Sequence, residues 1–133
     1  MIGLRGLVRE NRPVIKAGFT RSVEDDYEAL VLLDEPSGDT LEFQRSLSRP
    51  DAQDAALGMD TYSIVRAGAA VHYGGLVRFT VEAGVFTLEL TAEAAAVLEL
   101  PQVIELVLDD DGARVVDQHL PRILAPWAEP EHA

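Results

Sequence analysis

The feature that most limits the fold of this chain is a repeated alternation of apolar and polar residues. Apolar side chains recur at every second position in four segments, near residues 14–19, 77–82, 85–90 and 103–109. Successive side chains of a β-strand point to opposite faces, so each segment indicates a strand with one face on a core and the other in water. A sheet is therefore expected to form most of the core.

Three further segments extend this predicted sheet. Ala29–Leu33 is apolar at every position, as in a central strand, whereas residues 41–47 and 61–66 are weaker strands that each contain an aromatic residue. The connections are short, which favours antiparallel neighbours. In the tightest connection, Glu82–Val85, we expect Gly84 to be left-handed after a type I turn, with a bulge.

Two short helices are predicted to interrupt the strands. The first covers about residues 50–57, where Ser48 can cap its start and Gly58 can end it. The second covers about residues 92–99, with Thr91 as its N-cap. We expect the sheet to curl over this second helix and over a third.

A third helix begins after the acidic triplet Asp109–Asp111, which we interpret as a solvated turn and helix cap. Pro121 lies within its apolar pattern, so we expect a kink or an early end near His119. The fold class is α+β: a mostly antiparallel, curved sheet of about seven strands with two or three short helices. The 133 residues form a single domain, 1–133, with loosely ordered termini at about 1–12 and 126–133.

Composition narrows the environment of the protein. The chain contains no cysteine, which excludes disulfides, thiolate zinc sites and cysteine nucleophiles. No apolar stretch approaches the roughly 18 residues that span a bilayer, and no apolar signal region follows Met1. We therefore expect a cytoplasmic protein that has no contact with membranes.

The net charge of −12 arises from 23 acidic against 11 basic residues. Such a surface repels phosphate backbones, so no nucleic acid is expected as a partner, whereas a basic protein would be attracted. Part of this charge lies in Glu24, Asp25 and Asp26, beside Tyr27. The triplet is either a solvated turn or an acidic contact for a basic partner. For the charge as a whole, the alternative is simple solubility.

Motifs of known catalytic or metal sites are mostly absent. The sequence has no phosphate-binding glycine loop, no HExxH and no GxSxG. Asp109–Gly112 lacks the ligand spacing of a calcium loop. Asp60 and His72 could meet across a hairpin, but they would need further ligands to hold a metal. We therefore expect no catalytic residue, no metal and no cofactor.

The most unusual segment extends from Asp51 to Gly75 and is rich in aromatic residues, glycine and acids. Tyrosine is enriched at the centres of protein interfaces, and paired glycines allow positive φ. The segment is either an interface or a structural corner with a core tyrosine and a glycine bend. The residues concerned are Asp60, Tyr62, His72, Tyr73, Gly74 and Gly75.

This segment also resembles a known family. Gln53–Ile64 contains Asp-Thr-Tyr and His72–Leu76 contains Tyr-Gly-Gly, a pair that is similar to immunity protein family 10 of bacterial polymorphic toxin systems. Leu41–Ser46 and Leu90–Pro101 are similar to that family as well. The resemblance extends over about residues 27–124.

The resemblance implies a protein that binds and neutralises a cognate toxin, without enzymatic activity. Ser63 stands where the family pattern has cysteine, which argues against thiol chemistry there. Because an acidic domain can occupy a basic cleft and compete with phosphate, we hypothesise that the toxin is a nuclease.

Three alternatives remain beside an immunity protein. The first is a small metabolite- or peptide-binding module with a pocket beside Tyr62 and Tyr73. The second is an enzyme with Asp60 and His72 in a cleft. The third is a structural protein that oligomerises through an exposed strand edge. The sequence leaves the oligomeric state open.

Overall fold

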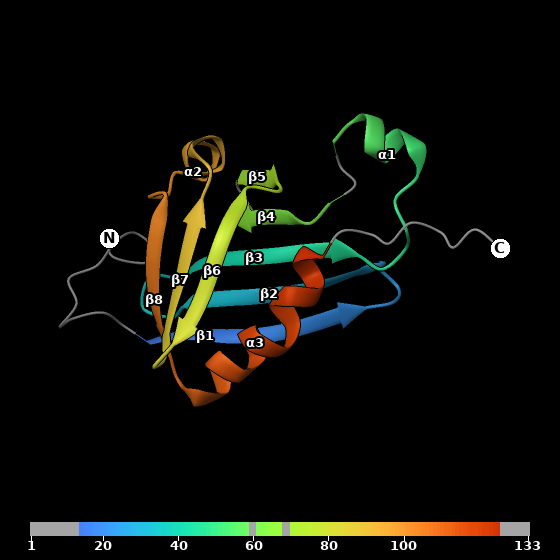
Figure 1. Cartoon of the computed structure of the whole chain (residues 1–133). Coiled ribbons are helices and arrows are strands. Elements are labelled where there is room, and N and C mark those ends of the chain that lie inside the picture. The colour runs from blue at the N-terminus through green and yellow to red at the C-terminus, as the bar shows by residue number, and fades with distance from the viewer. Residues whose placement is uncertain (1–13, 59–60, 68–69, 126–133) are drawn as a thin grey trace.

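The computed structural model describes residues 14–58, 61–67 and 70–125 (Figure 1). Within these ranges the chain forms one open, mostly antiparallel sheet of eight strands with three helices, which confirms the predicted α+β class. The elements in order are β1 (Val14–Ser22), β2 (Tyr27–Asp34), β3 (Asp39–Ser46), α1 (Ala52–Ala56), β4 (Ser63–Arg66), β5 (Ala70–Tyr73), β6 (Leu76–Glu82), β7 (Val85–Leu90), α2 (Ala92–Leu98), β8 (Val103–Leu108) and α3 (Asp110–Leu124).

The sheet has the strand order β5-β4-β3-β2-β1-β8-β7-β6. All neighbours are antiparallel except β1 and β8, which run parallel and pair only at Val14–Val107 and Ile15–Leu108. At this narrow seam the sheet bends, so that β6–β8 cross the direction of β1–β3 (Figure 1). The strand that the sequence did not predict is β5, whose four residues are too few for a clear alternation.

The core lies between the bent halves of the sheet, with α3 along β1–β3 and α2 against β5 and β7 (Figure 1). We call the side of β1–β5 that faces this core the inner face and the opposite side the outer face. As predicted, α2 begins at Thr91, whose side chain accepts a hydrogen bond from Ala94 N at 3.1 Å. The fully buried core residues include Ile15, Leu30, Leu32, Leu41, Phe43, Ile64, Phe86, Leu88, Leu98, Val116 and Leu120.

Two expectations for helix ends were wrong. The N-cap of α1 is Asp51, whose side chain accepts from Asp54 N at 2.8 Å, while Asp54 Oδ2 accepts from Asp51 N at 3.1 Å. Ser48 instead donates its N–H and its hydroxyl to Asp26 Oδ1, because it lies too far ahead of the first turn. The predicted end of α1 at Gly58, with φ +72°, is confirmed.

The early end of the third helix was also wrong, because α3 continues through Pro121. Pro121 lies on the exposed side of the helix, as does Asp117, whose carbonyl loses its helical donor and can be hydrated. Leu120 and Ile123 are buried beside it and hold the last turn by packing. His119 stacks on Phe19, with ring centroids 3.8 Å apart and planes 6° apart.

The turn between β6 and β7 differs from the expected one. Ala83 and Gly84 both have positive φ, +51° and +77°, and Glu82 pairs directly with Val85. This is the pattern of a two-residue type I′ turn, which has no room for the predicted bulge. The twist of this turn matches that of the flanking strands. The stabilisation from hairpin pairing therefore exceeds the strain of about 1 kcal/mol at Ala83.

Candidate functional site

The unusual segment that ends at Gly75 divides between the two faces of the sheet. His72 and Tyr73 are consecutive in β5, so their side chains point to opposite faces. His72 lies with Tyr62 on the inner side, whereas Tyr73 is exposed on the outer face. Asp60 lies outside the described residues. The structure therefore separates a structural corner from an exposed surface.

Tyr62 holds the connection between β5 and β6. Its hydroxyl accepts a hydrogen bond from Leu76 N at 3.0 Å, and its carbonyl accepts one from Gly74 N at 2.9 Å. Burial of the ring raises the pKa of the Tyr62 phenol, and the hydrogen bond from Leu76 partly opposes this shift. The half-buried Tyr62 thus fixes the connection between β5 and β6 through two hydrogen bonds.

His72 and Gly75 join the same connection to α2. His72 Nδ1 donates to the Gly74 carbonyl at 3.0 Å, and its Nε2 lies 3.6 Å from Glu93 Oε2. Gly75 has φ +101°, and a Cβ atom there would lie 2.5 Å from Ala94 Cβ. Only glycine fits this approach, which supports the structural-corner interpretation for these residues. The described part of the chain contains no group of three or more His, Asp or Glu that could hold a metal ion.

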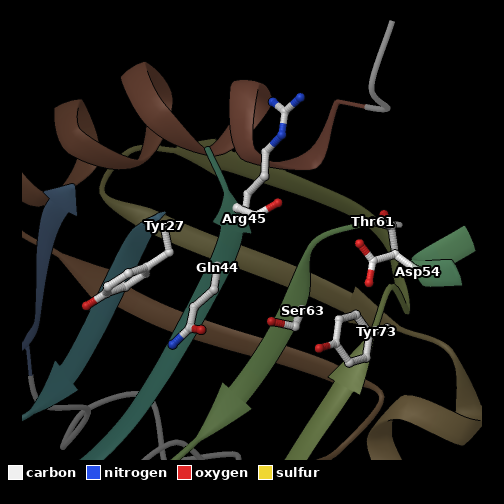
Figure 2. A pocket seen from close by; sticks show the side chains of 8 residues that line it. Tyr27, Gln44, Arg45, Asp54, Thr61, Ser63 and Tyr73 are labelled. Atoms are coloured by element: carbon white, nitrogen blue, oxygen red, sulfur yellow. The ribbon is translucent and has the colours of Figure 1, made fainter. Parts of the chain in front are cut away.

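Tyr73 borders a hollow of about 260 Å³ on the outer face. The hollow lies over β2–β5, with α1 at its rim (Figure 2). Its lining residues are Tyr27, Gln44, Arg45, Ser46, Asp54, Thr61, Ser63 and Tyr73.

The charges around the hollow favour a cationic guest. Among its described lining residues, Asp54 is the only acid and Arg45 the only cation. The guanidinium of Arg45 points away toward α3, where Nη1 donates to the Arg122 carbonyl at 2.7 Å (Figure 2). Burial lowers the pKa of Arg45, and nearby Glu28 acts in the opposite direction. The hollow is left with mainly hydroxyl, amide and carboxylate oxygens.

Sequence reasoning identified only Tyr73 among these lining residues. The other seven were missed, although a signal for most of them existed. Three of the four segments that carry the family resemblance, residues 41–46, 53–64 and 72–76, meet here and supply every described lining residue except Tyr27. The position of Tyr27 follows from its pairing with Ser46, which depends on strand register.

The acidic triplet forms the turn between β1 and β2. Asp25 Oδ2 accepts from Ser22 Oγ at 3.0 Å, and Asp26, at φ +59°, accepts from Ser48. Asp26 therefore has a structural task, while Glu24 and Asp25 lie on an exposed tip. Through Ser48 this tip is tied to the segment that leads into α1.

No helix in the described part of the chain has the length and apolar character needed to cross a membrane.

The family model described as immunity protein 10 matches residues 14–116. No curated protein and no solved structure matches the chain significantly. The matched range covers most of the chain, from β1 into α3. The chain therefore belongs to the immunity protein 10 family, and it is a non-catalytic inhibitor that binds the cognate toxin of a toxin system.

Proposed function

We propose that the cognate toxin is a basic, nucleic-acid-cleaving domain and that this protein neutralises it by covering the cationic cleft. The observation that carries the proposal is the net charge of −12. A nuclease holds phosphates with cationic side chains, and an acidic protein surface competes for the same groups.

The distribution of exposed acids gives this proposal a location. Exposed Glu24 and Asp25 lie at the tip between β1 and β2, and exposed Asp51 and half-buried Asp54 lie at the start of α1. Both sites are at the end of β1–β3 marked by the arrowhead of β3 in Figure 1. We call this end of the sheet the acidic end and expect its acids to attract a basic partner and raise the association rate.

The direct test is co-expression with a panel of toxin domains that differ in net charge and activity. We expect growth to be rescued only for a basic nuclease, together with a stable complex in a pull-down assay. Catalytically inactive versions of the same toxins control for toxicity that is unrelated to cleavage. Rescue from an acidic toxin, or from one with no activity on nucleic acid, would contradict the proposal.

The acidic tip has a kinetic test of its own. A Glu24→Gln/Asp25→Asn variant removes two charges while Asp26 keeps its contact with Ser48. The association rate with the toxin should fall about three- to tenfold at low salt, and its salt dependence should flatten.

A matched control removes two exposed charges elsewhere, Glu82→Gln on β6 and Asp117→Asn on α3. This control should change the rate much less, because these positions lie outside the acidic end. Equal rates for both double variants would show that total charge, and not the tip, directs association.

A pocket for a small ligand is less well supported. The hollow has a volume of about 260 Å³ and a largely polar lining. Pockets for drug-sized ligands are usually about 300–1,000 Å³ and mostly apolar. The hollow is better suited to a side chain presented by a protein.

A further inference from the structure

We infer that the hollow beneath α1 receives an arginine side chain of the toxin and forms the centre of the interface. The inference rests on the proposed function, because it requires a basic protein partner. It adds a named receptor site and a preferred side chain to that function.

The strand register places polar residues at the bottom of the hollow and a tyrosine at each side of it. Gln44 of β3 pairs with Ser63 of β4, which pairs with Tyr73 of β5. On the other side, Tyr27 of β2 pairs with Ser46 of β3. Tyr27 and Tyr73 are three strand spacings apart and two residues out of line along the strands, about 16 Å in all, which leaves room between the rings for one long side chain.

The oxygens of the hollow match the donors of a guanidinium group. Gln44 Nε2 already donates to Glu42 Oε1 at 3.0 Å, so its amide oxygen is directed to accept. Thr61, Ser63 and Tyr73 add hydroxyl groups, as the view in Figure 2 shows. A guanidinium has five N–H donors in one plane and also stacks on aromatic faces. An ammonium has only three donors and does not stack in this way.

Asp54 supplies the counter-charge at the rim. Its Oδ2 accepts from Asp51 N at 3.1 Å, which fixes the carboxylate as part of the α1 capping box. With the guanidinium of Arg45 turned toward α3, Asp54 is the one charged group among the described lining residues that remains at the hollow. Charge complementarity therefore selects a cation as the guest.

The surface around the hollow has the composition of an interface centre. The neighbouring row on the outer face pairs Val31, Glu42, Val65 and Val71 across β2–β5. Val71 is 48% and Tyr73 39% exposed, and no helix among the described residues covers this row. Apolar side chains next to tyrosines and a desolvated charge pair are typical of binding hot spots.

A titration with a defined probe tests the site without the toxin. Acetyl-Gly-Arg-Gly-amide is added to the ¹⁵N-labelled protein and followed by NMR, with the citrulline peptide as an uncharged control of the same shape. We expect shifts confined to Gln44, Ser63, Tyr73 and their neighbours, and none with citrulline. Shifts spread over other surfaces, equal shifts with citrulline, or no shifts at high millimolar peptide would overturn the inference.

Variants then test the same site in the complex with a toxin that the protein neutralises. Tyr73→Ala should weaken toxin binding about thirtyfold, in the range of an interface hot spot. Asp54→Asn removes the charge but keeps an oxygen for the cap, and it should weaken binding about tenfold. The controls Val77→Ala and Asp117→Asn alter exposed positions on β6 and α3, away from the hollow, and should stay within twofold.

These outcomes separate the two proposals. If the toxin is neutralised and bound but Tyr73→Ala and Asp54→Asn behave like their controls, the hollow is not the receptor, and the proposed function stands. If the peptide binds in the hollow but the neutralised toxin is acidic or does not act on nucleic acid, the proposed nuclease target fails instead. Circular dichroism of each variant excludes loss of fold as the cause.

Discussion

The two faces of β1–β5 differ although the same strands form them. On the inner face, Leu30, Leu41 and Phe43 are fully buried against α3 and the other half of the sheet. On the outer face, Val31 and Gln44 are only half-buried. Consecutive residues of one strand thus alternate between the packed core and an open surface, so substitutions one position apart should affect different properties.

Charged groups follow the same division. On the inner side Arg66 pairs with buried Asp39 at 3.1 Å and donates to the carbonyls of Leu98 and Glu99, both at 2.7 Å. This arginine ties β4 to the end of α2. The acids of the acidic end, such as Glu24, are exposed and contribute little to the fold.

The largest effect is expected from Phe43→Ala on the inner face. Phe43 is fully buried, and its truncation leaves a cavity, so the free energy of unfolding should fall by about 4 kcal/mol. Urea denaturation followed by circular dichroism measures this change. A loss below about 1 kcal/mol would mean that the inner face is not the packed side of the sheet.

Arg66→Ala should follow with a loss of about 3 kcal/mol, because it leaves Asp39 buried without its cation. Arg66→Lys keeps the charge but cannot reach the same carbonyls and carboxylate together, so it should fall between wild type and alanine. Thermal unfolding of the three proteins gives the order. If lysine and alanine were equally destabilising, the fork geometry and not the charge would dominate.

Tyr62→Phe removes the acceptor for Leu76 N and should cost about 1 kcal/mol at neutral pH. Because the folded-state pKa of Tyr62 is raised, the unfolded chain loses its proton first, and stability should fall as the pH rises above about 10. Urea denaturation at pH 7 to 11 measures both effects. The phenylalanine variant should show a shallower alkaline decline, and an identical decline would assign that loss to other groups.

The smallest effect on stability is expected from Gln44→Ala, one residue after Phe43. Gln44 lies on the open outer face, so the free energy of unfolding should change by less than about 0.5 kcal/mol. Toxin affinity, in contrast, should fall about tenfold if Gln44 forms the floor of the receptor hollow. Isothermal calorimetry and denaturation on the same samples compare the two. A large loss of stability with unchanged affinity would reverse the assignment of the faces.

Local patterns in the sequence predicted much of the fold. Alternation located four of the eight strands, apolar or aromatic composition located three more, and Thr91 and Gly58 marked helix ends correctly. Strand order was beyond reach, because the seam between Val14 and Val107 joins residues far apart in the chain and leaves no local trace. The type I′ turn was missed because Ala83 is an unusual residue for positive φ.

The candidate site was predictable only in part, for the same reason. Tyrosine composition identified Tyr73, but His72 was grouped with it although neighbours in a strand cannot share a face. Recognising β5 as a strand would have separated the two residues. Tyr27 and Ser63 reach the hollow only through pairings across β2–β5, which composition does not encode.

The parallel seam has a consequence for the order of events during synthesis. β1 is among the first described elements to leave the ribosome, yet its partner β8 is made about 90 residues later. Closing so long a loop is slow, and the hydrophobic interior stays open until α3 has emerged. The outer face of β2–β5 is thus synthesised before the seam can close, whereas complete burial of the interior has to wait for β8 and α3.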